Sequence, residues 1–229
     1  MADSTRRGNS TGILSGLLCS FVLTVVALVA ALGATLRADD AAEAQRLFAL
    51  LELKPGMTVG EIGAGSGGMT FEMAKRLGPD GRVFSTELNA DRRAEIRAGL
   101  TRDHLSNVTI VEAGDAATNL PDGCCDAIFM RDVYHHFTHP DEIDRTLVAA
   151  LKPGGRVAII DFVPKPGSTR PAGVPENRGG HGITPQIVID ELTRAGLTLS
   201  QDSTRWPEGH SNAGSDNNLF LLLFKKPAQ

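Results

Sequence analysis

Three alternating glycines form the first group of residues whose types and spacing suit chemistry. They occupy positions 63, 65 and 67, directly after a short apolar stretch over residues 57–62 and directly before an apolar helical pattern that begins at Met69. Glycine lets a ligand approach the backbone closely, and the first turn of the following helix offers free N–H groups. The order of strand, glycine turn and helix therefore predicts a nucleotide-binding site.

Two carboxylates narrow the class of ligand. Glu61 stands two residues before the first glycine, where its charge would repel a pyrophosphate and attract an ammonium or sulfonium group. Glu87 ends a second predicted strand, and its two oxygens can accept hydrogen bonds from both hydroxyls of a ribose. Because Gly63, Gly65 and Gly68 also fit the spacing of dinucleotide-binding loops, a nicotinamide dinucleotide stays open as the alternative ligand.

A polar run follows the fourth predicted strand, and polar residues at the carboxyl end of a central strand belong in the crevice of an open α/β sheet. Histidine suits a general base near neutral pH, which makes His135, His136 and the more distant His181 the candidate bases. Tyr134 and Asp132 would orient the base. Adjacent histidines on a helical turn point about 100° apart, so at most one of the pair faces the cleft, and His135 is favoured. The alternative is that both histidines pack at the strand–helix corner.

Taken in order, these motifs resemble those of class I methyltransferases that depend on S-adenosylmethionine (SAM). The motifs are Glu61-x-Gly63-x-Gly65-x-Gly67, the acidic strand end at Glu87, and Leu-Lys-Pro-Gly-Gly over residues 151–155. The strand end near the two histidines is similar to the branch that includes ubiquinone/menaquinone C-methyltransferases and many small-molecule enzymes. The resemblance covers residues 48–161, about half of the chain.

The resemblance implies SAM as the cofactor and assigns its contacts. Asp115 would meet the adenine amino group, the backbone N–H of Ala116 would meet the ring, and Leu88 would line the adenine. The residues expected to bind the cofactor are Glu61, Gly63, Ala64, Gly65, Gly67, Glu87, Leu88, Asp115, Ala116, Arg131 and Asp132.

The expected fold is α/β, with a Rossmann-like seven-stranded sheet that is mostly parallel, has an antiparallel last strand and carries helices on both faces. Strands are predicted over residues 57–62, 82–87, 108–112, 125–130, 156–161, 197–203 and 219–224, and helices over 39–53, 69–77, 89–100, 141–151 and 185–195. Thr184 is predicted to cap the last of these helices. Residues 163–182 form a Pro- and Gly-rich stretch that predicts a lid or substrate loop, with Arg170, Arg178 and His181 as its polar candidates.

Composition excludes one class of function and limits the cysteine chemistry. The formal net charge is −4, with one Trp and one Tyr, which argues against nucleic-acid binding. Bridging of the adjacent Cys124 and Cys125 would be strained, so both are expected to act as small apolar residues. No His/Cys cluster has zinc-site spacing, so no metal is predicted.

The N-terminal segment predicts membrane association. Residues 8–36 carry no charge, residues 13–32 are nearly all apolar, and Arg6 and Arg7 precede them. Twenty helical residues span about 30 Å, the thickness of a bilayer core. We therefore expect a signal peptide or membrane anchor over residues 1–38 and a SAM-binding methyltransferase domain over residues 39–229. The side of the membrane on which the domain lies is left open, as is the oligomeric state.

The predicted activity is transfer of a methyl group from SAM to a small-molecule or lipid, quinone-like acceptor. Two alternatives remain at this point: a carboxyl methyltransferase of the protein isoaspartate type, and a SAM-binding module without turnover. An NAD(P)-dependent oxidoreductase is disfavoured by Glu61 and by the later motifs.

Overall fold

The computed structural model describes residues 39–207 and 219–228. The predicted signal peptide or anchor and most of the loop expected before the last strand lie outside these residues. Among the residues that are described, no helix is long and apolar enough to cross a membrane. The chain divides into two compact units, residues 1–40 and 41–229, and the account below concerns the second.

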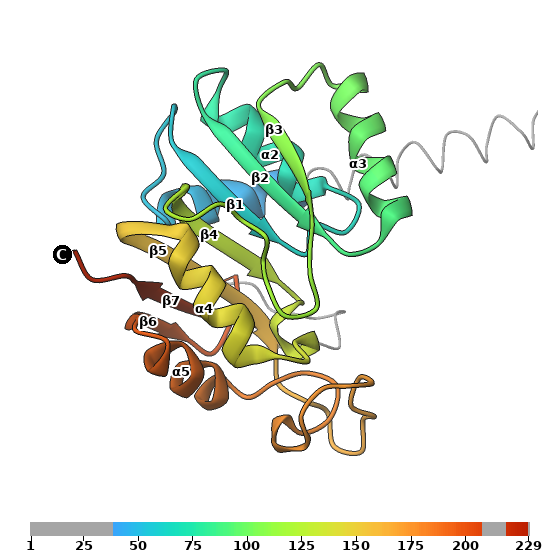
Figure 1. Cartoon of the computed structure of the whole chain (residues 1–229), viewed down its shortest axis with the longest axis vertical. Helices are drawn as coiled ribbons and strands as arrows, with labels where there is room; N and C mark the ends of the chain where they lie inside the picture. Colours follow the sequence, from blue (N-terminus) through green and yellow to red (C-terminus); the bar gives the residue numbers. More distant parts are fainter. Residues whose placement is uncertain (1–38, 208–218, 229) are drawn as a thin grey trace, which may run out of the picture. The chain divides into compact units, whose positions relative to one another are not determined.

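A seven-stranded sheet forms the centre of this unit (Figure 1). Its strands are β1 (Thr58–Ile62), β2 (Arg82–Glu87), β3 (Val108–Glu112), β4 (Cys125–Arg131), β5 (Leu151–Phe162), β6 (Thr198–Ser203) and β7 (Leu219–Lys225). They lie in the order β3-β2-β1-β4-β5-β7-β6, and β7 runs antiparallel to both of its neighbours. The predicted mostly parallel sheet with an antiparallel last strand is therefore confirmed.

The strands that follow β1 in the chain are added first on one side of β1 and then, from β4 onwards, on its other side. From β1 the chain proceeds outwards through β2 to β3, and it then returns to place β4 on the other side of β1. Connections that leave two neighbouring parallel strands in opposite directions open a crevice at the carboxyl ends of those strands. The topology thus locates a ligand site at the ends of β1 and β4.

Helices cover both faces of the sheet, as predicted. They are the helix over residues 39–50, α2 (Gly68–Leu77), α3 (Ala90–Arg102), α4 (Pro140–Ala150) and α5 (Pro185–Arg194). Along β4, Ile128 and Met130 pack in the cluster that contains α4 and α5, whereas Ala127 and Phe129 pack in the cluster that contains α2. Successive side chains of a strand point to opposite faces, so a central strand buried on both sides must be apolar throughout.

The glycine turn after β1 has the backbone geometry that only glycine adopts without strain. Gly63, Gly65 and Gly67 have φ values of 74°, 56° and 88°. A Cβ on Gly63 would also overlap the side chain of Val133, which follows β4, whereas a Cβ on Gly65 would meet no atom within 4 Å. The turn is therefore close-packed against the β4 end at Gly63 and open at Gly65.

This difference predicts unequal costs for two alanine substitutions. Gly63→Ala adds both left-handed backbone strain and steric overlap, and we expect a loss of about 2–4 kcal/mol in the free energy of unfolding. Gly65→Ala adds the backbone strain alone, about 1–2 kcal/mol. Urea denaturation of both variants measures the difference, and equal losses would show that Val133 moves aside at no cost.

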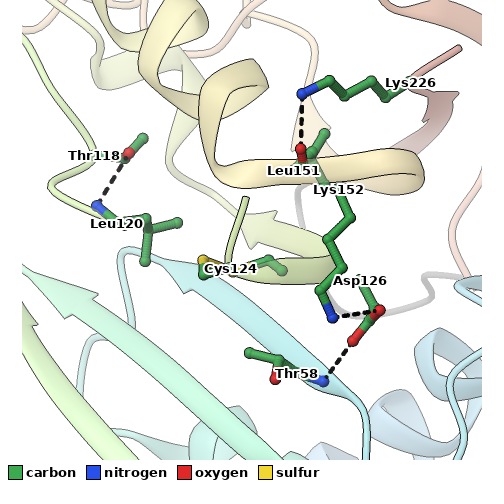
Figure 2. The surroundings of a disulfide bond; sticks show 9 residues. Thr58, Thr118, Leu120, Cys124, Asp126, Leu151, Lys152 and Lys226 are labelled. Carbon is green, nitrogen blue, oxygen red and sulfur yellow. Dashed lines mark hydrogen bonds and ion pairs between the residues drawn. A yellow bond between two sulfur atoms is a disulfide. The ribbon is translucent and has the colours of Figure 1, made fainter. Parts of the chain in front are cut away.

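The two adjacent cysteines differ from the expectation. A disulfide joins Cys124 to Cys125 at the start of β4, where no bridge was predicted. Cys125 is nevertheless fully buried and packs in the core against α4, as expected for a small apolar residue. Figure 2 shows the polar contacts nearby, in which Asp126 accepts hydrogen bonds from Lys152 and from the backbone N–H of Thr58.

The connection after β5 is ordered. It contains a short 3₁₀ turn, η2 (Glu176–Arg178), and Arg178 is buried rather than facing a substrate. The guanidinium donates to the backbone oxygens of Tyr134 and Phe137, at 3.1 and 3.4 Å, and pairs with Glu191 on α5. The expected substrate-facing role of Arg178 is therefore wrong, because this side chain ties the loop to the turn after β4 and to α5. Thr184 precedes α5 at the N-cap position, but its side chain makes no cap hydrogen bond there.

Candidate active site

A cavity of about 650 Å³, including its open mouth, lies at the carboxyl ends of β1 to β4. Each strand contributes the residues that directly follow it or end it. The lining residues that carry the argument are Gly63 after β1, Glu87 and Leu88 at the end of β2, Asp115 after β3, and Val133 and His136 after β4. This is the position at which open α/β sheets bind ligands.

Glu87 joins the glycine turn to the cavity. One carboxylate oxygen accepts a hydrogen bond from the backbone N–H of Gly65 at 2.8 Å, and the other accepts from that of Asn89 at 2.9 Å. Two carboxylate oxygens offer about four acceptor sites, so two remain for a bound diol. Glu87 thus orients the turn and keeps the capacity that the sequence assigned to it.

Glu61 lies away from this cavity. Its carboxylate is buried, accepts a hydrogen bond from the hydroxyl of Thr70 on α2, and lies 3.5 Å from that of Ser85 on β2. It is absent from the cavity lining. In this structure Glu61 fixes α2 against the sheet, and direct contact with a ligand ammonium stays a prediction.

The side walls of the cavity match part of the expected adenine site. Leu88 is 59% exposed and lines the cavity together with Asp115. A large apolar side chain left open at a cavity wall suits contact with a flat ring. Ala116 does not line the cavity, but its neighbour Ala117 does. Of the glycine turn, Gly63 lines the cavity, whereas Ala64, Gly65 and Gly67 shape the turn behind it.

Asp132 has an unusual backbone and an unsatisfied side chain. Its φ is 57°, a left-handed value that is uncommon outside glycine, and its N–H donates to the carbonyl of Ile160 at 2.9 Å. The buried Oδ1 atom makes no hydrogen bond within the described residues. Burial raises the pKa of Asp132, and the neighbouring Arg131 partly opposes that rise. Arg131 pairs with Glu43 at 3.4 Å and does not line the cavity, so its contact with the cofactor stays a prediction.

Three histidines meet beside the cavity. His135 and His136 lie in the 3₁₀ turn η1 (Tyr134–His136) after β4, and His181 comes from the loop before α5. The Nε2 atoms of His135 and His181 are 3.3 Å apart, and the ring centroids of His135 and His136 are 4.1 Å apart. Burial lowers the pKa of His136, and nearby His135 and His181 lower it further. Of the adjacent pair only His136 lines the cavity, which agrees with the expectation that at most one of them faces the cleft, but the favoured residue, His135, is the buried one.

Asp161 is the functional residue that sequence reasoning missed. It lies near the end of β5, is fully buried, and has Oδ1 2.8 Å from Nδ1 of His135, while Oδ2 accepts from the backbone N–H of the same residue at 3.1 Å. A carboxylate only accepts hydrogen bonds, so Nδ1 of His135 carries the proton and Nε2 presents a lone pair. A polar residue at the end of a buried strand that neighbours β4 was the available signal.

Tyr134 does not reach the histidine cluster. Its side chain is fully buried, and its hydroxyl lies 2.8 Å from Asp144 on α4 and 2.9 Å from Glu191 on α5. Burial raises the pKa of Tyr134 well above its ordinary value, so the hydroxyl stays protonated. The predicted orienting role of Tyr134 at the base is therefore wrong, because the residue anchors η1 to α4 and α5.

The Tyr134 network predicts a specific dependence of stability on pH. Burial raises the pKa of Asp144 to about 7, with the hydrogen bond from Tyr134 opposing this shift and the charge of Glu191 adding to it. Between pH 4 and 7 the folded protein then keeps a proton that the unfolded chain has lost, so the free energy of unfolding falls as pH rises. Asp144→Asn should remove this fall in the free energy of unfolding, which amounts to at most about 4 kcal/mol between pH 4 and 7. Urea denaturation between pH 4 and 8 measures it.

The matched control is Asp141→Asn, on the same helix with an exposed carboxylate that faces Arg194. We expect this variant to keep the pH slope of the parent protein. A slope that survives in Asp144→Asn would show that the Asp144 carboxyl does not hold its proton in the folded state.

Known proteins resemble this chain in the same region. Residues 60–159 match a family model described as a methyltransferase domain. The ubiquinone/menaquinone biosynthesis C-methyltransferase UbiE of Pseudomonas paraeruginosa is 31% identical over 118 residues, which cover 51% of this chain and 46% of that protein. The chain therefore spans about half of the length of the curated relatives that it matches.

Solved structures share the fold across most of the chain. A SAM-dependent methyltransferase from Aquifex aeolicus has a TM-score of 0.63 at 21% identity and covers 80% of this chain and 89% of its own. Phosphoethanolamine N-methyltransferase 2 of Haemonchus contortus, solved with SAM, has a TM-score of 0.63 at 17% identity. The match covers 84% of this chain and 53% of that one. These chains show the fold, and the family match and the sequence relatives show the class.

Residues 60–159 match a methyltransferase domain, and the relatives and solved structures that resemble the chain include SAM-dependent methyltransferases. Among the curated proteins that it matches are C-methyltransferases of ubiquinone and menaquinone biosynthesis. The cavity fits SAM as its cofactor by its own features, since Glu87 keeps free acceptor sites for a ribose and Leu88 leaves an open apolar wall for an adenine.

Proposed function

We propose that the protein transfers a methyl group from SAM to a small-molecule acceptor of the quinol type, in which a ring carries an ionisable hydroxyl. One observation carries this proposal. His136 lines the cofactor cavity and also belongs to the cluster with His135 and His181, so the cofactor and the candidate activating groups share a wall. The similarity to quinone-pathway C-methyltransferases supports the acceptor class.

SAM supplies a methyl group on a sulfonium sulfur, and the residues of this chain supply placement and proton handling. Glu87, Leu88 and Asp115 hold the nucleoside end at one side of the cavity. A displacement of this kind needs its reacting atoms in line, so placement and exclusion of water supply most of the acceleration. The histidine cluster favours ionisation of the acceptor hydroxyl, and Asp161 fixes the orientation of His135 for this purpose.

We also infer that residues 1–38 attach the protein to a membrane or direct its export. The uncharged run behind Arg6 and Arg7 supports this proposal. A membrane location would bring the site close to a lipid-soluble acceptor. Fractionation of the full chain and of a chain that lacks residues 1–38 tests it, and equal recovery of both in the soluble fraction would contradict it.

The decisive experiment follows methyl transfer from labelled SAM into a membrane extract and into synthetic hydroquinones. We expect label in a ring-bearing product with the parent protein and none with Glu87→Ala. SAM binding without transfer to any acceptor would favour a non-catalytic binding module. Label that enters protein carboxyl groups would favour the isoaspartate type of enzyme, and binding of NAD in place of SAM would contradict the methyltransferase function itself.

A further inference from the structure

The three histidines form a convergent set of nitrogen ligands. One ring nitrogen from each of His135, His136 and His181 lies within 4.8 Å of the others, although His181 is 46 residues away from His135 along the chain. His135 is buried, whereas His136 and His181 are exposed at the mouth of the site. The cluster is therefore held in the protein interior at His135 and is open to solvent at His136 and His181.

The distance between the two closest nitrogens matches the distance between two ligand atoms on one metal ion. Tetrahedral zinc binds imidazole nitrogen at about 2.0–2.1 Å, which places neighbouring ligand atoms about 3.3–3.4 Å apart. The Nε2 atoms of His135 and His181 are 3.3 Å apart. A direct N–H···N hydrogen bond would account for this pair alone, and it would leave the convergence of the third imidazole without a cause.

The surroundings of His135 are those of a metal ligand. Its Nδ1 is held by the buried Asp161 carboxylate, which leaves the Nε2 lone pair aimed at the cluster. Metal-bound histidines almost always donate their other ring N–H to a carboxylate or carbonyl, and this contact fixes the tautomer and the ring orientation. Phe162 packs its ring against His135 and His181, with centroids 4.7 and 5.3 Å away, and limits the rotation of both.

We propose that His135, His136 and His181 bind one divalent transition-metal ion of the zinc type, and that this ion binds an oxygen of the methyl acceptor. Three imidazoles leave a fourth position open, as in catalytic zinc sites. The assignment of the acceptor rests on the proposed methyl transfer, whereas the metal site itself does not. It replaces the sequence expectation of no metal, which depended on ligands close together in the chain.

The ion would sit where the acceptor must react. His136 is shared with the cofactor cavity, so an acceptor held by the ion lies beside the methyl group. The acceptor hydroxyl loses its proton to bulk water, which the nearby positive charge favours. The bond from the acceptor to the methyl carbon then forms as the carbon–sulfur bond breaks, and the electron pair of that bond goes to sulfur to give S-adenosylhomocysteine.

Metal binding tests the site without SAM or acceptor. The purified full chain, stripped with a chelator, is titrated with Zn²⁺ by calorimetry and with Co²⁺ by visible absorption. We expect one equivalent of each ion to bind, with the intense visible bands of four- or five-coordinate cobalt. His136→Ala and His181→Ala should each weaken binding by about 100-fold or more, and Asp161→Asn by about 10–100-fold.

The control variant is His139→Ala, which removes an exposed histidine three residues beyond the cluster, where Nδ1 lies 3.1 Å from the Thr138 hydroxyl. It should bind both ions as the parent does. Circular dichroism confirms that each variant is folded. Failure of the folded parent to bind either ion, or equal weakening by His139→Ala and His181→Ala, would overturn the metal site.

A second experiment tests separately whether the metal site exists and whether the protein transfers methyl groups. The stripped protein should bind SAM within about twofold of the parent and transfer no methyl group, and added Zn²⁺ should restore transfer. Full transfer by the stripped protein would overturn the role of the ion in catalysis. Intact Zn²⁺ binding together with no transfer in any form would overturn the proposed methyl transfer and support the metal site alone.

Discussion

Replacement of Glu87 by alanine should weaken SAM binding by about 150- to 25,000-fold. The variant loses two hydrogen bonds from the ribose to a charged acceptor, each of which contributes about 1.5–3 kcal/mol. It also releases the backbone N–H of Gly65, which Glu87 holds at 2.8 Å, so the glycine turn loses its fixed position. Isothermal calorimetry with SAM and with S-adenosylhomocysteine measures the effect.

Glu112→Gln provides the matched control for Glu87→Ala. Glu112 ends β3 beside Glu87 in the register of the sheet, but it does not line the cavity and pairs with Arg93 at 3.2 Å. We expect its affinity for SAM to stay within about twofold of the parent, because removal of an exposed charge changes local energies by less than about 1 kcal/mol. Equal losses in the two variants would show that net charge at this edge, rather than contact with Glu87, governs binding.

Replacement of His181 by alanine should leave SAM binding intact and reduce methyl transfer about 100- to 10,000-fold. His181 is exposed and lies outside the cofactor cavity, so the nucleoside contacts persist. Loss of a proton-handling or acceptor-orienting group costs this much in rate when chemistry limits turnover. Steady-state transfer of labelled methyl, with affinity for SAM measured in parallel, separates the two effects.

Asp161→Asn acts on the same step through the orientation of His135. An asparagine side chain can turn its amide towards Nδ1 and donate to it, which moves the imidazole proton to Nε2 and removes the lone pair that faces the cluster. We expect a fall in the maximal rate with little change in SAM affinity, and a changed dependence of rate on pH. His139→Ala is again the control, and equal rates in His139→Ala, His181→Ala and the parent would exclude the cluster from catalysis.

The comparison of predicted and observed elements shows where local patterns suffice. The predicted strands over residues 82–87 and 108–112 agree with β2 and β3 in every residue. Both are short strands bounded by turn residues, and such boundaries are encoded within a few positions of the chain. The helix expected over residues 89–100 begins one residue later, since Asn89 caps it by accepting from the backbone N–H groups of Asp91 and Arg92.

Side-chain roles after β4 could not be deduced in the same way. Tyr134, His135 and His136 are consecutive in sequence, yet Tyr134 turns into the core towards Asp144 while both histidines converge with His181. A 3₁₀ turn decides this division, and its packing partners lie on α4, α5 and the loop before α5. Side-chain direction in a short turn depends on these distant contacts rather than on the turn's own residues.

The sequence by itself determined the class of the domain, the succession of its strands along the chain and the carboxylate that faces the cavity, because the glycine turn, Glu87 and the buried strands are local patterns of shape and polarity. Only the tertiary structure brought His181 to His135, placed Asp161 behind that histidine and buried Arg178 beneath Tyr134. These contacts join residues 26 to 46 positions apart. The packing of the whole sheet and of the loop that follows β5 decides such contacts, since no short stretch of chain contains both partners.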